Sequence, residues 1–301
     1  MAKSRLPYLL VDAFTDTPGG GNRVALVLDA RGMSSEEMHQ IAQRLGYPQA
    51  AFVTDWLGGS YSVRFFTPSG EVEFAGHAAI ALALTLVRQG MAREGETRLF
   101  LRTPVETLPV EIEYEAGAPV KAILRGPSPR FRDPPQWKHI QEVMEVLGVG
   151  DRYLHRGLPY GVAFTGLWSL FLPFVAPGLV DEVEPEMERL GEFCARLEIS
   201  TLHAYAPLGP RTFYARDFAP LLGIPEDPVT GSANAALGAL LARAGVVPRR
   251  EEAVDLTVLQ GHRMGMPGTV EVRVEFSPGG EPYRVFIGGK AVQAESGGLE
   301  P

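Results

Sequence analysis

The chain has 301 residues, of which 45% are hydrophobic and 21% are charged, a composition typical of a soluble globular protein that is long enough for two cores. Its formal net charge of -8 argues against a surface for nucleic acid or for an anionic membrane, and it favours a small molecule as partner. The single cysteine, Cys194, excludes an intrachain disulfide and a thiolate cage for a metal. We therefore expect a reducing, cytoplasmic location.

The first predicted elements are a strand, a turn and a helix. The apolar run of MAKSRLPYLLVDAF is too short for a signal peptide and predicts a strand. No Gly-Lys-Ser/Thr follows TPGGGNR, and no helical pattern begins there, so this stretch predicts a tight turn rather than a phosphate loop. SSEEMHQIAQRLG begins with a capping box formed by Ser34 and Glu37, and it stops at Gly46. It predicts an amphipathic helix.

The remaining patterns predict a mixed, strand-rich chain. Helices are expected near Trp137 to Leu147 and near Glu186 to Leu197, the second just after Pro185 and with Cys194 on or near its apolar face. Short alternating or apolar runs predict strands at AFVTDW, YSVRFF, RLFLRT, VEIEYE, VEVRVEF and YRVFIGG.

One uncharged stretch, Gly161 to Val180, is about as long as a membrane span. It is divided by Thr165-Gly166, Pro173 and Pro177-Gly178 into short aromatic and β-branched pieces. Two buried strands joined by a turn fit this pattern better than one helix, so we expect no membrane partner.

An internal repeat is the most informative pattern. GHAAIALALTLVRQG (Gly76 to Gly90) and GSANAALGALLARAG (Gly231 to Gly245) share Gly, Ala, Leu and Arg residues at matching positions, and an acidic turn precedes each copy. The copies lie about half a chain apart, which predicts two related halves. Because both segments are apolar nearly all the way round, we expect helices that are buried on every side by strands.

Each repeat helix begins at a glycine, where free backbone N–H groups and the positive end of the helix dipole favour an anion. Polar side chains gather at these starts: His77 at one, and Asp227, Thr230 and Ser232 at the other. Each also has a simpler interpretation, since a lone histidine is often structural, Ser232 can cap the helix and Asp227 can be a turn residue. Their equivalent places in a repeat favour a shared site for a carboxylate-bearing substrate.

Three stretches carry a family resemblance: VDAFTDTPGGGNRVALVL, FFTPSGEVEFAGHAAIALA and GIPEDPVTGSANAAL. They resemble the signature stretches of the PhzF-like family, the phenazine-biosynthesis isomerases and their relatives, and QGHRMGMPGTVEV with VFIGGKAV is similar to that family's C-terminal pattern. The resemblance runs over essentially the full length.

The resemblance implies an α+β, diaminopimelate-epimerase-like fold, with two pseudo-symmetric lobes that are each a strand-rich barrel around a central apolar helix. We place the first lobe at 1–118, with a C-terminal strand at 284–301 returning to it, and the second at 119–283. The active site is expected in the cleft between the lobes. The family's characterised isomerase moves a proton within a cyclic dihydro-hydroxyanthranilate, and family members use no metal or organic cofactor and are commonly homodimers.

Carried over by position, the resemblance implies that His77, Asp227 and Ser232 are catalytic and that the backbone N–H groups of Gly76 and Gly231 meet the substrate. We add Ala78, Thr230 and Asn22 as candidate substrate-binding residues.

The family's catalytic Glu is the exception, because PQAAFV places Gln49 there, next to Ala50 in place of a Thr. An amide cannot take a proton at neutral pH. Three outcomes stay open: Asp227 or His77 serves as the base, the reaction differs, or the site binds a ligand without turnover.

Other classes of site find little support. The two-cysteine racemases of this fold are excluded, since Ala75 and Thr230 precede the two entrance glycines. The six histidines show no paired spacing, which argues against a metal site. Two hypotheses follow: a cofactor-independent isomerase acting on a small carboxylated substrate, and a catalytically quiet binding or regulatory relative.

Overall fold

A computed structural model describes residues 5–250 and 252–300. The chain forms two compact units. Unit 1 comprises Met1–Arg125 with Gly288–Pro301, and unit 2 comprises Gly126–Ile287.

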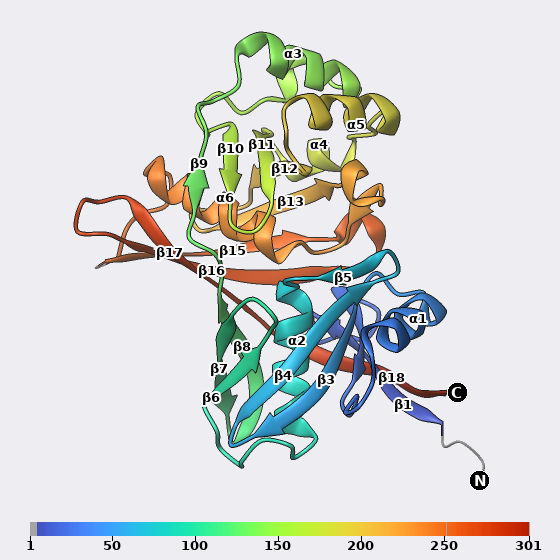
Figure 1. The fold of residues 1–301 in the computed structure, drawn as a ribbon. Coiled ribbons are helices and arrows are strands. Elements are labelled where there is room, and N and C mark those ends of the chain that lie inside the picture. Colours follow the sequence, from blue (N-terminus) through green and yellow to red (C-terminus); the bar gives the residue numbers. More distant parts are fainter. Residues whose placement is uncertain (1–4, 251, 301) are drawn as a thin grey trace. The chain divides into compact units, whose positions relative to one another are not determined.

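Unit 1 is rich in strands, which lie around the helix α2, and it also contains the helix α1 (Figure 1). The strands β2 and β3 are parallel, as are β4 and β6, and the other strand pairs that the structure records within this unit are antiparallel. Its elements are β1 (Leu6–Ala13), β2 (Asn22–Val27), α1 (Ser35–Leu45), β3 (Ala50–Leu57), β4 (Ser60–Thr67), β5 (Gly70–Val72), α2 (Gly76–Arg88), β6 (Arg98–Arg102), β7 (Thr107–Glu115), β8 (Ala118–Arg125) and β18 (Ala291–Leu299).

The core of unit 1 lies around α2. All its residues from Ala78 to Leu86 are buried, and the helix contacts strands β1, β2, β3, β6, β7, β8 and β18 of the same unit. Burial of each large aliphatic side chain on this helix contributes roughly 2 kcal/mol. The expectation of a helix buried on every side is therefore confirmed here.

The amphipathic helix α1 also forms as the sequence predicts. Ser34 accepts a hydrogen bond from the backbone of Glu37, whose side chain accepts one from the backbone of Ser34. Gly46 ends the helix in a left-handed conformation. Met38 and Ala42 point into a second apolar cluster formed with β1, β2, β3 and β4.

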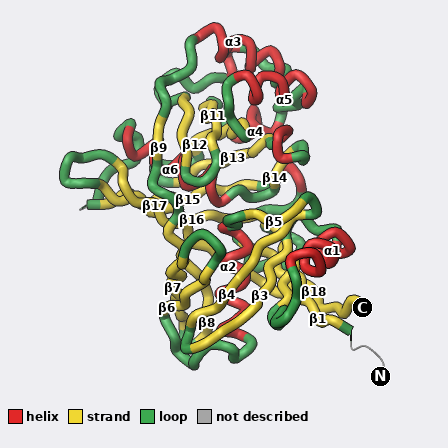
Figure 2. Tube along the Cα trace, viewed as in Figure 1, coloured by secondary structure: helices red, strands yellow, loops and turns green. Residues whose placement is uncertain are grey.

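Unit 2 carries more helix than unit 1 (Figure 2). Its elements are β9 (Arg130–Phe131), α3 (Trp137–Val146), β10 (Gly161–Phe164), β11 (Trp168–Pro173), α4 (Pro177–Asp181), α5 (Met187–Arg196), β12 (Thr201–Pro207), β13 (Thr212–Phe218), β14 (Glu226–Asp227), α6 (Gly231–Arg243), β15 (Ala253–Gln260), β16 (Gly268–Phe276) and β17 (Pro282–Gly289), with short 3-10 turns at Asp151–Tyr153, Pro220–Leu222 and His262–Met264.

The second repeat helix, α6, lies among strands β10, β11, β15 and β16. It approaches β16 so closely that a Cβ atom on Gly238 would lie 2.6 Å from Cγ1 of Val272. A separate apolar cluster packs α3, α4 and α5 onto the sheet, and Cys194 of α5 is fully buried in it.

The two units repeat one strand order, which explains the sequence repeat. Pairing runs β18–β1–β2–β3–β4–β6–β7 in unit 1 and β9–β10–β11–β12–β13–β15–β16 in unit 2. The short strands β5 and β14 lie at equivalent places on β4 and β13. The helices α2 and α6 each have 13 residues and connect equivalent parallel strands. The expected fold class of two pseudo-symmetric halves is confirmed.

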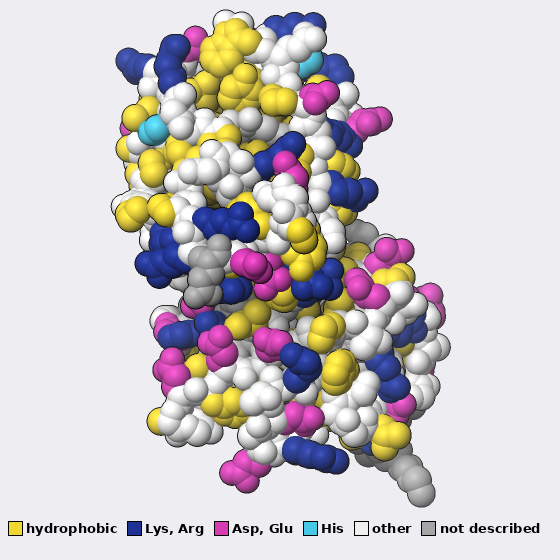
Figure 3. Space-filling view, turned by 90° about the vertical axis from the view of Figure 1, so that its left-hand side faces the viewer, with side chains coloured by type: hydrophobic (Ala, Val, Ile, Leu, Met, Phe, Trp, Pro, Cys, Tyr) yellow, Lys and Arg dark blue, Asp and Glu magenta, His cyan; other side chains and the backbone are white. Residues whose placement is uncertain are grey.

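The uncharged stretch from Gly161 to Val180 forms two antiparallel strands and the short helix α4. Within residues 5–250 and 252–300, no helix combines the length and apolarity needed to cross a membrane. The predicted turn at TPGGGNR also forms: Gly21 has φ +64, and a Cβ there would overlap the carbonyl oxygen of Ala13. On the face shown in Figure 3, basic and acidic side chains are interspersed.

Candidate active site

The first repeat helix start lies in unit 1, where α2 follows an N-cap residue, Ala75, that has no side-chain cap hydrogen bond. The first turn holds no acidic residue, and Arg88 lies in the last turn. The backbone N–H groups of Gly76, His77 and Ala78 have no partner within the helix, because a helix leaves its first donors unpaired. Together with the helix dipole, they favour an anion at this start.

His77 presents a neutral imidazole at this start. Its side chain is half-buried overall, but its Nε2 atom is buried and makes no hydrogen bond within the described part of the chain. Burial lowers the pKa of His77 from 6.5 to about 4, since it disfavours the charged ring. At neutral pH the ring therefore acts through hydrogen bonding rather than charge.

Gln49 and Asn22 lie at one edge of the unit 1 sheet. β2 and β3 are parallel, and the carbonyl oxygen of Gln49 accepts a hydrogen bond from the backbone N–H of Ala25 at 3.0 Å. Asn22 begins β2 and is 2% exposed. The Oε1 atom of Gln49 is buried without a hydrogen-bond partner among the described residues. This edge thus offers an amide oxygen where the family resemblance implies a carboxylate.

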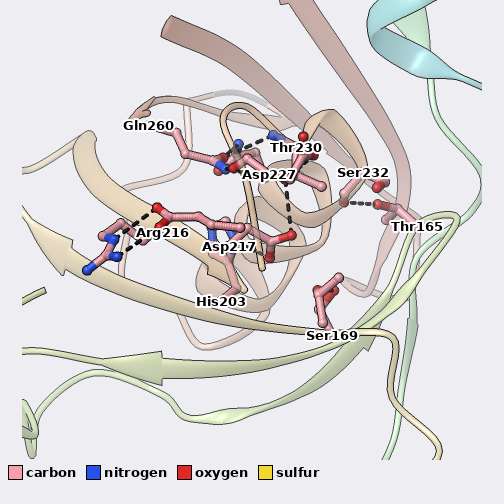
Figure 4. Close-up of polar contacts among 12 residues, drawn as sticks. Thr165, Ser169, His203, Arg216, Asp217, Asp227, Thr230, Ser232 and Gln260 are labelled. Carbon is pink, nitrogen blue, oxygen red and sulfur yellow. Dashed lines mark hydrogen bonds and ion pairs between the residues drawn. The ribbon is translucent and has the colours of Figure 1, made fainter. Parts of the chain in front are cut away.

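The second helix start, in unit 2, has Thr230 as its N-cap residue and Gly231 as its first helical residue. Ser232 is the second helical residue, so the interpretation of Ser232 as the cap is wrong. Its carbonyl oxygen accepts a hydrogen bond from the Thr165 hydroxyl at 2.6 Å (Figure 4). Ser232 therefore occupies the position in α6 that His77 occupies in α2.

A network of amide and hydroxyl groups braces this start. Gln260, at the end of β15, accepts hydrogen bonds through Oε1 from the backbone N–H of Thr230 at 3.1 Å and from Asn234 Nδ2 at 2.7 Å. Its Nε2 group donates to the carbonyl oxygen of Asp227 at 2.9 Å and lies 3.2 Å from Thr230 Oγ1. The loop from Asp227 to Thr230 is therefore held against the helix.

Two carboxylates meet at the Thr230 hydroxyl. Its Oγ1 atom lies 2.6 Å from Asp227 Oδ2 and 3.0 Å from Asp217 Oδ2. Asp217 Oδ1 lies 2.9 Å from Nδ1 of His203, and both of these side chains are completely buried (Figure 4). The candidate residue Asp227 is thus one end of a chain that continues through Thr230 and Asp217 to His203.

Strand register explains why these three ionisable groups meet. His203 in β12 lies opposite Asp217 in β13, which lies opposite Asp227 in β14. Residues directly opposite across antiparallel strands point to the same face, so the three side chains form one row. The sequence patterns did not single out His203 and Asp217; the signal was a histidine in the mostly apolar strand TLHAYAP and the Arg216-Asp217 pair in the strand TFYARDF.

Arg216 holds the neighbouring part of this strand pair. It binds Glu226 at 2.9 and 2.8 Å, and its Nη1 group donates to the carbonyl oxygens of Val180, Asp181 and Val183. β14 is thereby fixed on β13, which positions Asp227. Within the residues that the structure describes, no group of three or more His, Cys, Asp and Glu side chains is arranged for a metal ion.

Comparison with known proteins identifies the family. The sequence profile of the family described as "Phenazine biosynthesis-like protein" matches residues 11–297. The chain belongs to the phenazine biosynthesis-like family. An "Uncharacterized isomerase" of Deinococcus radiodurans is 43% identical over 96% of this chain and 93% of its own length. The trans-2,3-dihydro-3-hydroxyanthranilate isomerase of Pseudomonas chlororaphis is 29% identical over 89% of this chain and 90% of its own.

Among solved structures, a phenazine biosynthesis protein of the PhzF family from Bacillus anthracis matches with a TM-score of 0.90, 26% identity and 99% of both chains covered. The expected phenazine biosynthesis-like fold is confirmed by this match. The named relatives of this family member are isomerases, and isomerase is the activity class that they support.

Proposed function

We propose that this chain is an isomerase that moves a proton within a small carboxylated substrate and needs neither a metal nor an organic cofactor. Membership of a family with named isomerases supports the reaction class. The observation that supports the proposal most directly is the contact of 2.6 Å between Asp227 and the hydroxyl of Thr230, which places an acid/base group at a helix start. The single cysteine supports a cytoplasmic setting, and the family resemblance supports a homodimer.

The roles follow from the chemistry of the groups. The N-terminal N–H groups of α6, with the Ser232 hydroxyl, suit a substrate carboxylate. Asp227 is half-buried and exchanges the proton. His77 is neutral because its pKa is about 4, and its Nε2 atom can form a hydrogen bond with a group bound at the start of α2.

Replacement of the proposed acid/base group tests this function. Asp227→Asn should reduce turnover by about 100- to 10,000-fold, the range that a positioned general acid or base contributes. Turnover is measured by NMR as the uptake of solvent deuterium into a panel of small carboxylates that includes trans-2,3-dihydro-3-hydroxyanthranilate, the compound that names the Pseudomonas relative.

Asp255→Asn is the matched control, since Asp255 lies in the same unit on β15 and is 51% exposed in an ion pair with Arg273. It should exchange deuterium at the wild-type rate. Equal rates in wild type, Asp227→Asn and Asp255→Asn would refute the role of Asp227.

A second candidate function is a catalytically quiet member that binds or senses a small molecule. One observation favours it: Gln49 presents an amide oxygen, buried and without a hydrogen-bond partner among the described residues, where the resemblance implies a catalytic Glu. Calorimetry separates the two functions, because the quiet relative binds a carboxylate of the panel with no deuterium uptake.

A further inference from the structure

The hydroxyl of Thr230 has too few hydrogen atoms to form hydrogen bonds with two ionised carboxylates. A threonine hydroxyl has one hydrogen to donate and two lone pairs to accept with. Its oxygen faces Asp217 Oδ2 at 3.0 Å and Asp227 Oδ2 at 2.6 Å. The hydroxyl can donate to only one of them, so the other contact needs a hydrogen on the carboxyl group.

The amide of Gln260 cannot resolve this shortage. Its Oε1 atom must face the backbone N–H of Thr230, which always donates, so its Nε2 group faces Thr230 Oγ1 and donates to it. One lone pair of the hydroxyl oxygen is thereby used. A proton on one carboxyl group fills the second lone pair, so both lone pairs and the hydrogen of the hydroxyl are then used.

Electrostatics favour the same proton count. Two carboxylates bridged by one hydroxyl repel each other, and Asp217 is completely buried. Arg216 is already bound to Glu226 and to three carbonyl oxygens. His203 contacts the other oxygen of Asp217. Burial, and then the negative charge of Asp217, raises the pKa of the neighbouring Cys194 thiol to about 12, so that thiol is neutral.

We propose that Asp217 and Asp227 share a single proton through the hydroxyl of Thr230, which lets Asp227 act as either acid or base. In one state Asp227 carries the proton and donates to Thr230, while Thr230 donates to Asp217. In the other, both hydrogens shift along the chain, so that Asp217 carries the proton and Asp227 is a carboxylate. The net charge of the pair is the same in both states.

This proton balance suits an isomerisation, and in this respect the inference rests on the proposed function. Asp227 as a carboxylate takes a proton from one substrate carbon, and the pair then holds two protons. Return of one proton to another carbon restores the single shared proton. No other reactant is needed, and the completely buried His203 and Asp217 act as positioning residues.

The repeat supplies an internal comparison. In unit 1 the equivalent row is Ala51 opposite Phe65 opposite Val72, and the equivalent N-cap residue is Ala75. The equivalence follows from the spacing, since α2 begins five residues after the partner of Phe66 in β5, and α6 begins five residues after the partner of Phe218 in β14. All four positions are apolar in unit 1. The fold therefore does not require a polar row here.

Infrared spectroscopy of the full chain at pH 7, without substrate, tests the proposal. The C=O stretch of a protonated carboxyl group lies apart from the carboxylate bands and shifts in D2O. Difference spectra between wild type and each of Asp227→Asn and Asp217→Asn should show the loss of one such band, equivalent to one proton per chain. Either amide can donate to Thr230, so neither variant needs a carboxyl proton.

Asp255→Asn is again the control and should retain the band. A wild-type spectrum without the band, or a band that persists in either Asp227→Asn or Asp217→Asn, would overturn the shared proton. Asp227 is half-buried, so its variant stays informative if Asp217→Asn does not fold. The spectra are recorded without turnover. Inactivity with the whole panel of carboxylates would therefore refute the isomerase function but would not contradict the shared proton.

Discussion

The half-buried imidazole of His77, whose Nε2 atom is buried, makes the stability of the fold depend on pH. Its pKa is lowered from 6.5 to about 4 by burial, so the folded state binds this proton less readily than the unfolded chain does. At about 1.4 kcal/mol for each tenfold difference in proton affinity, the difference amounts to about 3 kcal/mol. This stability is present above pH 6.5 and is lost as the pH falls toward 4.

His77→Gln removes the titrating group and keeps a side chain that can form hydrogen bonds. We expect the free energy of unfolding of wild type to fall, relative to His77→Gln, by about 3 kcal/mol between about pH 7.5 and pH 4, with a slope near 1.4 kcal/mol per pH unit in the middle of this range. The measurement is urea-induced unfolding followed by circular dichroism at half-unit steps of pH.

Wild type and His77→Gln contain the same carboxyl groups. The contribution of these groups to the free energy of unfolding therefore cancels in the difference between the two proteins. His262→Gln, which removes an exposed histidine, serves as the control for loss of an imidazole as such. Parallel curves of unfolding free energy against pH for wild type and His77→Gln would refute the neutral, buried state assigned to His77.

The remaining predictions concern the amide at Gln49 and the anchor of β14. If Asp227 exchanges the proton, Gln49→Glu should leave the rate of deuterium uptake within about tenfold of wild type, and a gain of about 100-fold or more would favour the quiet relative instead. Arg216→Met should lower the free energy of unfolding in urea by about 3 to 5 kcal/mol, because it leaves Glu226, whose side chain is only 12% exposed, without its ion-pair partner. Arg273→Met, in an exposed pair, should cost less than about 1 kcal/mol, and equal losses would contradict this assignment.

Local sequence patterns predicted the helices and the repeat because their causes are local. The capping box of Ser34 and Glu37 and the left-handed Gly46 lie within one helix, and the apolar runs of α2 and α6 reflect burial on all sides. The stretch from Gly161 to Val180 was predicted as two strands with a turn, and β10 and β11 confirm it. The short helix α4 was missed, since five residues carry too little periodicity to be recognised.

The polar row in unit 2 could not be predicted in the same way. His203 and Asp217 are 14 residues apart, and they meet only because β12 and β13 pair in one particular register. A shift of one residue would turn each side chain to the other face. Asp227 and Thr230, by contrast, are three residues apart and were predicted as neighbours at one helix start.

The two halves share a strand order but differ in their ionisable groups. This difference bears on which group acts as the base. In unit 1 the helix start presents an imidazole whose pKa is about 4, and Gln49, just before β3, is an amide that cannot be protonated at neutral pH. Neither group is charged at neutral pH. In unit 2 the corresponding start presents Asp227 within a pair that holds one proton in either of two places. We therefore propose that proton exchange takes place in unit 2.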